Sequence, residues 1–305
     1  MTDTKGRLHI GIDIGGTKAN IGLIDDKACL LAKTKIPTGS GASYEAILDK
    51  IIDSICKMVS DRKADIADVA TIGIGVPGTV DDQTGMVLFA PNLNWRGIPV
   101  VRYIKDRFPA QIHIAQDTRA AAWGEYMLGA GKAYKDMACV TLGTGIGCGI
   151  IIDGRIYKGG LNTAGEIGHT IVEKEGRLCN CGRNGCLEAY AGGIAIAKIA
   201  SEYMGFHVTT QEVFAMAKSG NEYAYKIIND AAQYIGMGLV NLLNLISPQA
   251  IIISGGMSVE QELLVRPIER FVREHGYDLA ADKVKIDVAS LGEDAPMMGA
   301  AMLYV

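Results

Sequence analysis

Four potential metal ligands lie close together between residues 169 and 186. Nine residues separate His169 from the run Cys179-Asn-Cys181-Gly-Arg-Asn-Gly-Cys186. Three thiolates and one imidazole form the Cys₃His ligand set of a closed structural zinc site. The glycines of the run would allow the tight turns that bring the thiolates to one ion. We therefore predict a structural Zn²⁺ here; the alternative is a coincidental group of reduced cysteines.

Two glycine-rich turns could bind phosphate. Asp13-Ile-Gly-Gly-Thr-Lys18 opens a stretch that aligns without gaps on 141–153, which contains Gly143-Thr-Gly-Ile-Gly147. Both stretches have the pattern of strand, turn and strand. Backbone N–H groups in such turns form an anion-binding concavity, and the Asp13 carboxylate suits a hydrated Mg²⁺. The pattern fits either a duplicated phosphate-binding domain or two ordinary hairpins.

Three carboxylates could act on a substrate. Asp117 follows an expected strand and begins an expected helix. It is therefore either a helix N-cap or a ligand-binding group at the carboxyl end of a strand. Glu166 and Glu188 flank the cysteine cluster, where a fixed metal loop would direct them toward vicinal hydroxyls. The alternative is that both are solvated surface acids.

A third glycine motif, Gly73-Ile-Gly-Val-Pro-Gly78, has the spacing G-x-G-x-x-G. A dinucleotide fingerprint of this spacing must open a helix, whereas Thr-Val-Asp-Asp follows here and indicates a loop. This excludes a dehydrogenase. The sequence also lacks a P-loop and the protein-kinase motifs, so phosphoryl transfer would need another architecture.

Hydrophobic periodicity predicts alternating strands and helices, which is typical of an α/β protein. Strands are expected at 8–14, 19–25, 28–36, 69–76, 86–89, 111–115, 136–142, 146–152, 249–253 and 284–288. Helices are expected at 43–62, 98–108, 117–128, 193–204, 209–219, 221–246, 258–274 and 296–304.

The bulk properties narrow the class of protein. A length of 305 residues suggests two domains. The net charge of −4 argues against nucleic-acid binding. Neither a signal peptide nor an apolar run of ~20 residues is visible, so we expect a soluble cytoplasmic protein without a membrane partner. The four remaining cysteines are expected to be small core residues: Cys29, Cys56, Cys139 and Cys148.

Taken together, these motifs resemble the ROK family (repressors, open reading frames and kinases) of sugar kinases, over nearly the whole chain. The glucokinase and N-acetylhexosamine-kinase branches are the most similar. The resemblance rests on Asp13-Ile-Gly-Gly-Thr-Lys18, Gly75-Val-Pro-Gly78, Pro91-Asn-Leu-Asn-Trp95, Leu142-Gly-Thr-Gly-Ile-Gly147, Ala164-Gly-Glu-Ile-Gly-His169, Cys179-Asn-Cys-Gly-Arg-Asn-Gly-Cys-Leu-Glu188 and Ser254-Gly-Gly256.

The resemblance implies a duplicated actin-like (ribonuclease H-like) ATPase fold of class α/β, with two domains around a cleft and a zinc-binding loop. We expect the domains at 1–120 and 121–305, with the final helix able to pack back on the first. The resemblance also implies ATP with Mg²⁺, structural Zn²⁺, a small-molecule sugar and a homodimer or homotetramer.

The family motifs assign roles by position. Asp117 resembles the catalytic aspartate, and His169 would serve both the metal and the sugar. The residues expected at the nucleotide are Asp13, Gly15, Gly16, Thr17, Lys18, Gly143, Thr144, Gly145, Gly255 and Gly256. Those expected at the sugar are Gly78, Thr79, Asn92, Gln116, Asp117, Glu166, His169 and Glu188, and those at the metal are His169, Cys179, Cys181 and Cys186.

The acceptor is open at this stage. The family resemblance favours the 6-hydroxyl of glucose or a close relative, and the alternatives are N-acetylmannosamine, N-acetylglucosamine, allose or a cyclitol. Most kinases of the family have an asparagine before the catalytic aspartate and another two positions after it, where this chain has Gln116 and Arg119. A sugar-sensing regulator without activity is the alternative of another class. No helix-turn-helix is expected before the first glycine turn.

Overall fold

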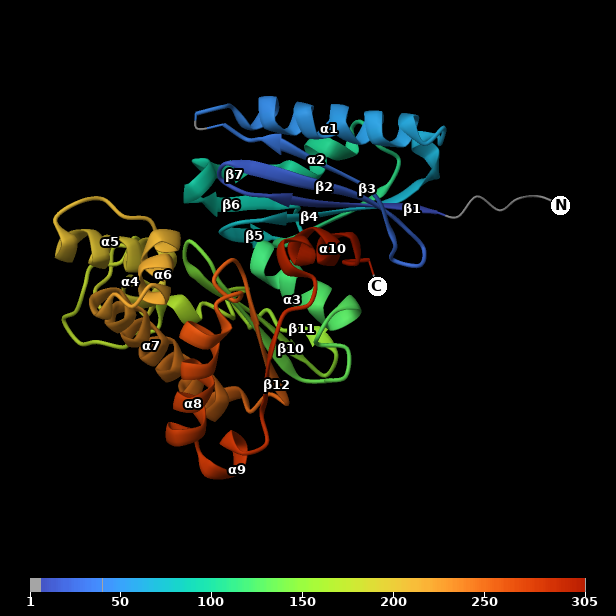
Figure 1. The fold of residues 1–305 in the computed structure, drawn as a ribbon. Coiled ribbons are helices and arrows are strands. Elements are labelled where there is room, and N and C mark those ends of the chain that lie inside the picture. Colours follow the sequence, from blue (N-terminus) through green and yellow to red (C-terminus); the bar gives the residue numbers. More distant parts are fainter. Residues whose placement is uncertain (1–6, 40, 305) are drawn as a thin grey trace. The chain divides into compact units, whose positions relative to one another are not determined.

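The computed structural model describes residues 7–39 and 41–304 and divides the chain into two compact units (Figure 1). The first unit comprises Met1–Lys132, Gly159–Thr163 and Glu293–Val305. The second comprises Ala133–Lys158 and Ala164–Gly292. The predicted boundary after residue 120 falls inside a helix of the first unit.

The first unit is built on a five-stranded mixed sheet of order β3-β2-β1-β4-β8 and a small antiparallel sheet of order β5-β6-β7. Its strands are β1 (Leu8–Ile14), β2 (Lys18–Asp25), β3 (Leu30–Pro37), β4 (Val69–Val76), β5 (Thr79–Asp81), β6 (Met86–Ala90), β7 (Trp95–Ile98) and β8 (Gln111–Gln116). Its helices are α1 (Tyr44–Asp61), α2 (Val100–Lys105), α3 (Asp117–Leu128) and α10 (Ala295–Ala301).

Helices cover both faces of this sheet (Figure 1), because successive side chains along each strand point to opposite faces. Ile10 and Ile12 on β1 are fully buried in the core shared with α1 and α2. Between them, Gly11 faces α10, and an added Cβ would collide with the α10 backbone at Met297. Gly73 on β4 meets Ala300 in the same way. Two strand glycines therefore let the last helix lie directly against the sheet.

The second unit repeats this plan with a sheet of order β11-β10-β9-β12-β13. Its strands are β9 (Met137–Leu142), β10 (Ile146–Ile152), β11 (Arg155–Ile156), β12 (Ala250–Ser254) and β13 (Lys285–Val288). Its helices are α4 (Glu188–Ala191), α5 (Gly193–Met204), α6 (Thr210–Lys218), α7 (Glu222–Ile246), α8 (Arg266–His275) and α9 (Asp278–Ala281). Helix α7 supplies much of the core, through Ile228, Ile235 and Leu239.

The two large sheets share one topology, and this supports the repeat seen in the sequence. In each, the first three strands form an antiparallel meander, and two further strands add parallel to its first strand. The glycine turns aligned in the sequence are the β1–β2 and β9–β10 turns. This duplication is consistent with the actin-like fold expected from the family resemblance.

Two local predictions were wrong. Residues 79–81 form strand β5 instead of a loop, because they pair with β6. The helix expected over 258–274 is present as a π-helical turn, Gln261–Val265, that continues into α8, in which Pro267 has no N–H to donate. Cys29 and Cys56 are exposed, whereas Cys139 and Cys148 are buried as expected. Cys56 follows buried Ile55 on α1, and one helical residue turns the side chain by about 100° toward solvent.

No helix among residues 7–39 and 41–304 has both the length and the apolar composition that crossing a membrane would require.

Candidate functional site

In the first unit, the predicted catalytic residue Asp117 and the predicted nucleotide-site residue Asp13 lie at the carboxyl ends of the parallel strands. Asp13, the last residue but one of β1, pairs with Gly75 of β4, which in turn pairs with Ala115 of β8. The carboxyl ends of three parallel strands therefore meet here, where α/β folds bind ligands. Asp117 begins α3 directly after β8, and its Cα lies 3.6 Å from the position of a Cβ added to Gly75.

Asp117 is the first residue of α3, and Gln116 takes the N-cap position expected for the aspartate. The Asp117 Oδ1 accepts a hydrogen bond of 2.7 Å from the backbone N–H of Thr118. This bond fixes the orientation of the carboxylate. A carboxylate held at the start of a helix is stabilised by the helix dipole.

The first glycine turn is closed by a hydrogen bond from Gly15 N to Lys18 O of 2.8 Å. A Cβ added to Gly16 would lie 2.9 Å from the carbonyl oxygen of Asn92, so a predicted sugar contact packs against a predicted phosphate turn. Lys18 makes an ion pair of 3.6 Å with Glu293. Glycine at these positions leaves the turn amides accessible to an anion.

Asn20 is a residue of this site that the sequence interpretation missed. Its Nδ2 donates to the Asp13 Oδ2 at 3.2 Å. Burial raises the pKa of the Asp13 carboxyl, while this hydrogen bond and the positive charge of Lys18 act in the opposite direction. The hairpin register, which pairs Asp13 with Asn20, could have revealed the contact, because paired residues share a face of the sheet. A single carboxylate of this kind fits a Mg²⁺ ion that keeps most of its water.

In the second unit, the two predicted nucleotide turns adjoin. Gly255 follows β12 with a φ of +89°, and Met257 N donates to Leu142 O at 3.0 Å, just before the turn at Gly143. An added Cβ at Gly143 or Gly256 would meet nothing within 4 Å. Both glycines therefore face open space, as a phosphate or nucleoside would require.

Glu188 binds directly to the second turn. Its Oε2 accepts a hydrogen bond of 2.8 Å from Ile146 N, and a Cβ added to Gly145 would collide with this oxygen. The turn is held further by Gly193 N, which donates to Gly143 O at 2.9 Å. A predicted sugar ligand and a predicted phosphate turn therefore contact each other within this unit.

The four predicted metal ligands converge, with their ligand atoms within 4.8 Å of one another. The Cys181 and Cys186 sulfurs are 3.6 Å apart, and the Cys179 sulfur is 3.8 Å from His169 Nδ1. A tetrahedral Zn²⁺ with bonds of about 2.3 Å to sulfur would separate its thiolates by about 3.8 Å. The donor set and its spacing therefore fit zinc.

The backbone of the loop that carries the four predicted ligands accounts for two glycines of the cysteine run. Gly182 and Gly185 have φ values of +84° and +81°, a conformation that other L-residues rarely adopt. His169 turns Nδ1 toward the thiols, whereas its Nε2 lies 4.0 Å from the Glu166 carboxylate. The two ring nitrogens thus face different partners, which allows one imidazole to serve a metal and a substrate.

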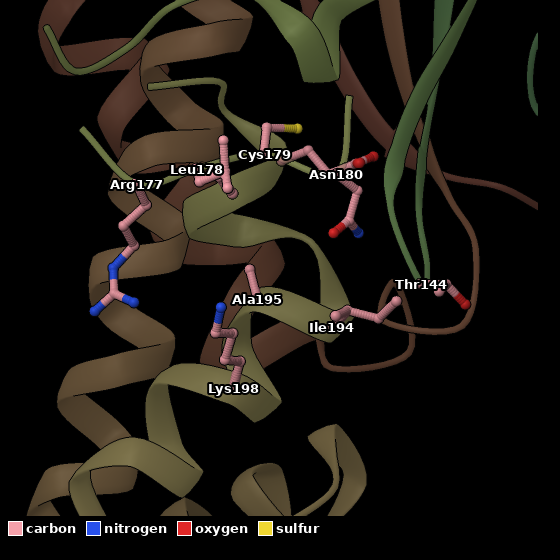
Figure 2. Close-up of a pocket in the computed structure, with 10 residues that line it drawn as sticks. Thr144, Arg177, Leu178, Cys179, Asn180, Ile194, Ala195 and Lys198 are labelled. Atoms are coloured by element: carbon pink, nitrogen blue, oxygen red, sulfur yellow. The ribbon is translucent and has the colours of Figure 1, made fainter. Parts of the chain in front are cut away.

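A hollow of about 150 Å³ adjoins these residues within the second unit (Figure 2). Figure 2 shows Thr144 on one side of the view and Arg177 on the other, with Lys198 of α5 between them. Arg177 makes an ion pair of 3.0 Å with Glu202. The hollow is lined by Thr144, Arg177, Leu178, Cys179, Asn180, Glu188, Ala189, Ile194, Ala195 and Lys198.

Comparison with known proteins decides the family. The model of the ROK family matches residues 9–305 of the chain. This chain belongs to the ROK family. The ROK relatives include a glucokinase of Halalkalibacterium halodurans, 32% identical over 97% of this chain and 94% of the relative.

A solved ROK structure, a glucokinase of Streptomyces griseus in complex with glucose and AMPPNP, is 35% identical with a TM-score of 0.82, over 97% of this chain and 98% of that one. A xylose repressor of Caldicellulosiruptor bescii is 28% identical over 97% of this chain and 77% of the repressor. These relationships support the predicted enzyme class, an ATP-dependent sugar kinase. The repressor shows that the family also includes proteins named as regulators.

Proposed function

We propose that this ROK protein transfers the γ-phosphoryl group of ATP to a hydroxyl of a hexose, with the 6-hydroxyl of glucose or a close relative as acceptor. The observation that carries the proposal is the arrangement of the first unit, where Asp13, a glycine turn and Asp117 lie together at the carboxyl ends of the parallel strands. The Streptomyces griseus relative, whose structure holds glucose and AMPPNP, supports the choice of ligands.

In this mechanism Asp117 is the general base. Its carboxylate accepts the proton of the sugar hydroxyl as that oxygen attacks the γ-phosphorus. The two glycine turns bind the phosphates through their backbone N–H groups. Asp13 would hold Mg²⁺, which when bound neutralises charge on the phosphates. Asn92, Glu166, His169 and Glu188 would orient the sugar, with Gly78, Thr79 and Gln116 nearby.

The Cys₃His loop would hold a structural Zn²⁺ through His169, Cys179, Cys181 and Cys186. Four protein ligands leave no open position, so this ion would shape the loop and take no part in the transfer. The predicted homodimer or homotetramer stays a prediction, which sedimentation of the purified protein would test.

The test of the function is ADP release across a panel of acceptors: glucose, mannose, N-acetylmannosamine, N-acetylglucosamine, allose and a cyclitol. We expect one hexose to give the highest kcat/KM, and ³¹P and ¹H NMR of its product to show phosphate on O6. ATP with no sugar measures the background hydrolysis. Release that stays at this background with every acceptor would contradict the kinase and favour a sugar-sensing regulator, which the similarity to a xylose repressor keeps as the second candidate.

Gly145→Ala tests the contact between Glu188 and the second turn. The added methyl would collide with the Glu188 carboxylate, which must then move away from Ile146 N. We expect KM to rise for both sugar and ATP by about ten-fold, the equivalent of one lost hydrogen bond to a charged group. Steady-state kinetics with each substrate varied in turn measures both constants. A change in only one KM would show that the residue serves one ligand.

A further inference from the structure

Arg119 is a buried cation in the first turn of α3, where the helix dipole disfavours positive charge. Its side chain is only 4% exposed. The guanidinium donates from Nη1 to Asn162 Oδ1 at 2.6 Å and from Nη2 to Asn162 O at 2.9 Å. A buried guanidinium is tolerated when its N–H groups find such acceptors. One residue, Asn162, supplies both.

Asn162 in turn connects to β5. Its side-chain Nδ2 donates to Val80 O at 2.7 Å and lies 3.5 Å from Asp82 Oδ1. The backbone of Asn162 has a φ of +57°, a left-handed conformation that asparagine accepts more readily than most residues. Asn162 lies in Gly159–Thr163, the short stretch that belongs to the first unit although the chain on both sides belongs to the second.

We propose that Arg119 and Asn162 are positioning residues for the sugar. They hold three segments of the first unit in register: the start of α3, strand β5, and the stretch that leads to Glu166. The first two segments lie next to the predicted sugar-site residues Asp117 and Thr79, and the third is followed three residues later by Glu166, which belongs to the second unit. Neither Arg119 nor Asn162 is assigned to the sugar, so their effect must pass through these neighbours. The inference rests on the proposed function and adds a determinant of its sugar affinity.

Asn162→Gly is the sharpest test, because glycine keeps the left-handed backbone without strain and removes only the bridging amide. We expect KM for the sugar to rise about ten-fold, KM for ATP to change by less than about two-fold, and kcat to fall less than KM rises. Hydrogen exchange should quicken in peptides covering 79–82 and 158–166. A residue with a merely structural role would lower Tm and leave the sugar KM unchanged.

Arg119→Gln and the double variant test the pairing. Because both residues act through one bridge, the double variant should lose no more sugar affinity than the worse single variant. Ser247→Gly is the matched control: Ser247 is exposed and left-handed, with a φ of +51°, at the end of α7, so its kinetics should equal those of the wild type.

The proposal is overturned by an unchanged sugar KM and unchanged exchange in Asn162→Gly, or by additive losses in the double variant. The positioning role of Arg119 and Asn162 can be tested separately from the kinase function. Wild-type protein that releases no ADP with any sugar would contradict the function, whereas sugar binding by calorimetry and the exchange rates would still decide whether the pair positions the site.

Discussion

Replacement of Asp117 with asparagine is expected to lower kcat by about 10²–10⁴-fold, the usual contribution of a positioned general base. The amide oxygen of asparagine can still accept the hydrogen bond that Thr118 N donates to Asp117 Oδ1, so the side chain keeps its orientation. The amide cannot take the proton of the attacking hydroxyl. Sugar binding, which does not require that proton transfer, should change by less than about ten-fold.

The two halves of this prediction need separate measurements. A coupled assay of ADP release gives kcat, and calorimetry gives the dissociation constant of the sugar. Asp106→Asn is the matched control, because Asp106 is an exposed aspartate at the end of α2, in the same unit. Its kcat should equal that of the wild type. An Asp117→Asn variant that keeps more than about a tenth of the wild-type kcat would remove this residue from the role of base.

The duplicated architecture was predictable because its signal is local and occurs twice. Each glycine turn joins two strands of an antiparallel hairpin, so the spacing of the glycines reports the strand ends directly. The same reason made the convergence of the cysteines predictable: three thiols lie within eight residues, Cys179 to Cys186, and the glycines between them adopt positive φ. Short sequence separation leaves few alternative arrangements for the side chains.

The features that could not be predicted from the sequence depend on pairing between residues far apart in the chain. Strand β5 has three residues and little hydrophobic signal, and it exists because β6 pairs with it. Arg119 departs from the family pattern, but its partner Asn162 lies 43 positions later, and no periodicity connects them. The fold brings such residues together through tertiary packing, which overrides local preference and is not encoded in any single segment.

Removal of one predicted metal ligand should cost the protein both its zinc and part of its thermal stability. Serine at position 186 offers a neutral hydroxyl where the site requires a thiolate, so Cys186→Ser should lose its zinc, from about one ion per chain to almost none. Backbone hydrogen bonds such as Cys179 N to Arg183 O and Gly185 N to Arg177 O help to shape this loop, and its isolated bridges pair Ile171 with Cys186 and Leu178 with Asn184. A bound metal would add a further link between the ligand side chains, so the variant should also unfold at lower temperature.

In Cys186→Ser, the kinetic constants for the sugar should change more than those for ATP. Glu166, His169 and Glu188 lie beside the loop in sequence and depend on it for their positions, so we expect kcat/KM for the sugar to fall by about 100-fold. Glu188 also holds the second glycine turn through Ile146 N, so KM for ATP should rise as well, but the backbone bond from Gly193 N to Gly143 O should keep that rise smaller. Elemental analysis, melting curves and steady-state kinetics measure the three effects.

Cys56→Ser separates the loss of a ligand from the loss of a thiol, because Cys56 is exposed on α1 and lies far along the chain from the cluster. This variant should keep its zinc, its melting temperature and its activity. Dialysis of the wild type against a strong chelator should reproduce the Cys186→Ser phenotype, and added Zn²⁺ should reverse it only in the wild type. A wild-type protein that contains no zinc, or a Cys186→Ser protein that retains a full equivalent, would contradict the Cys₃His site. Full activity in a zinc-free variant would instead separate the metal from the sugar residues that flank it.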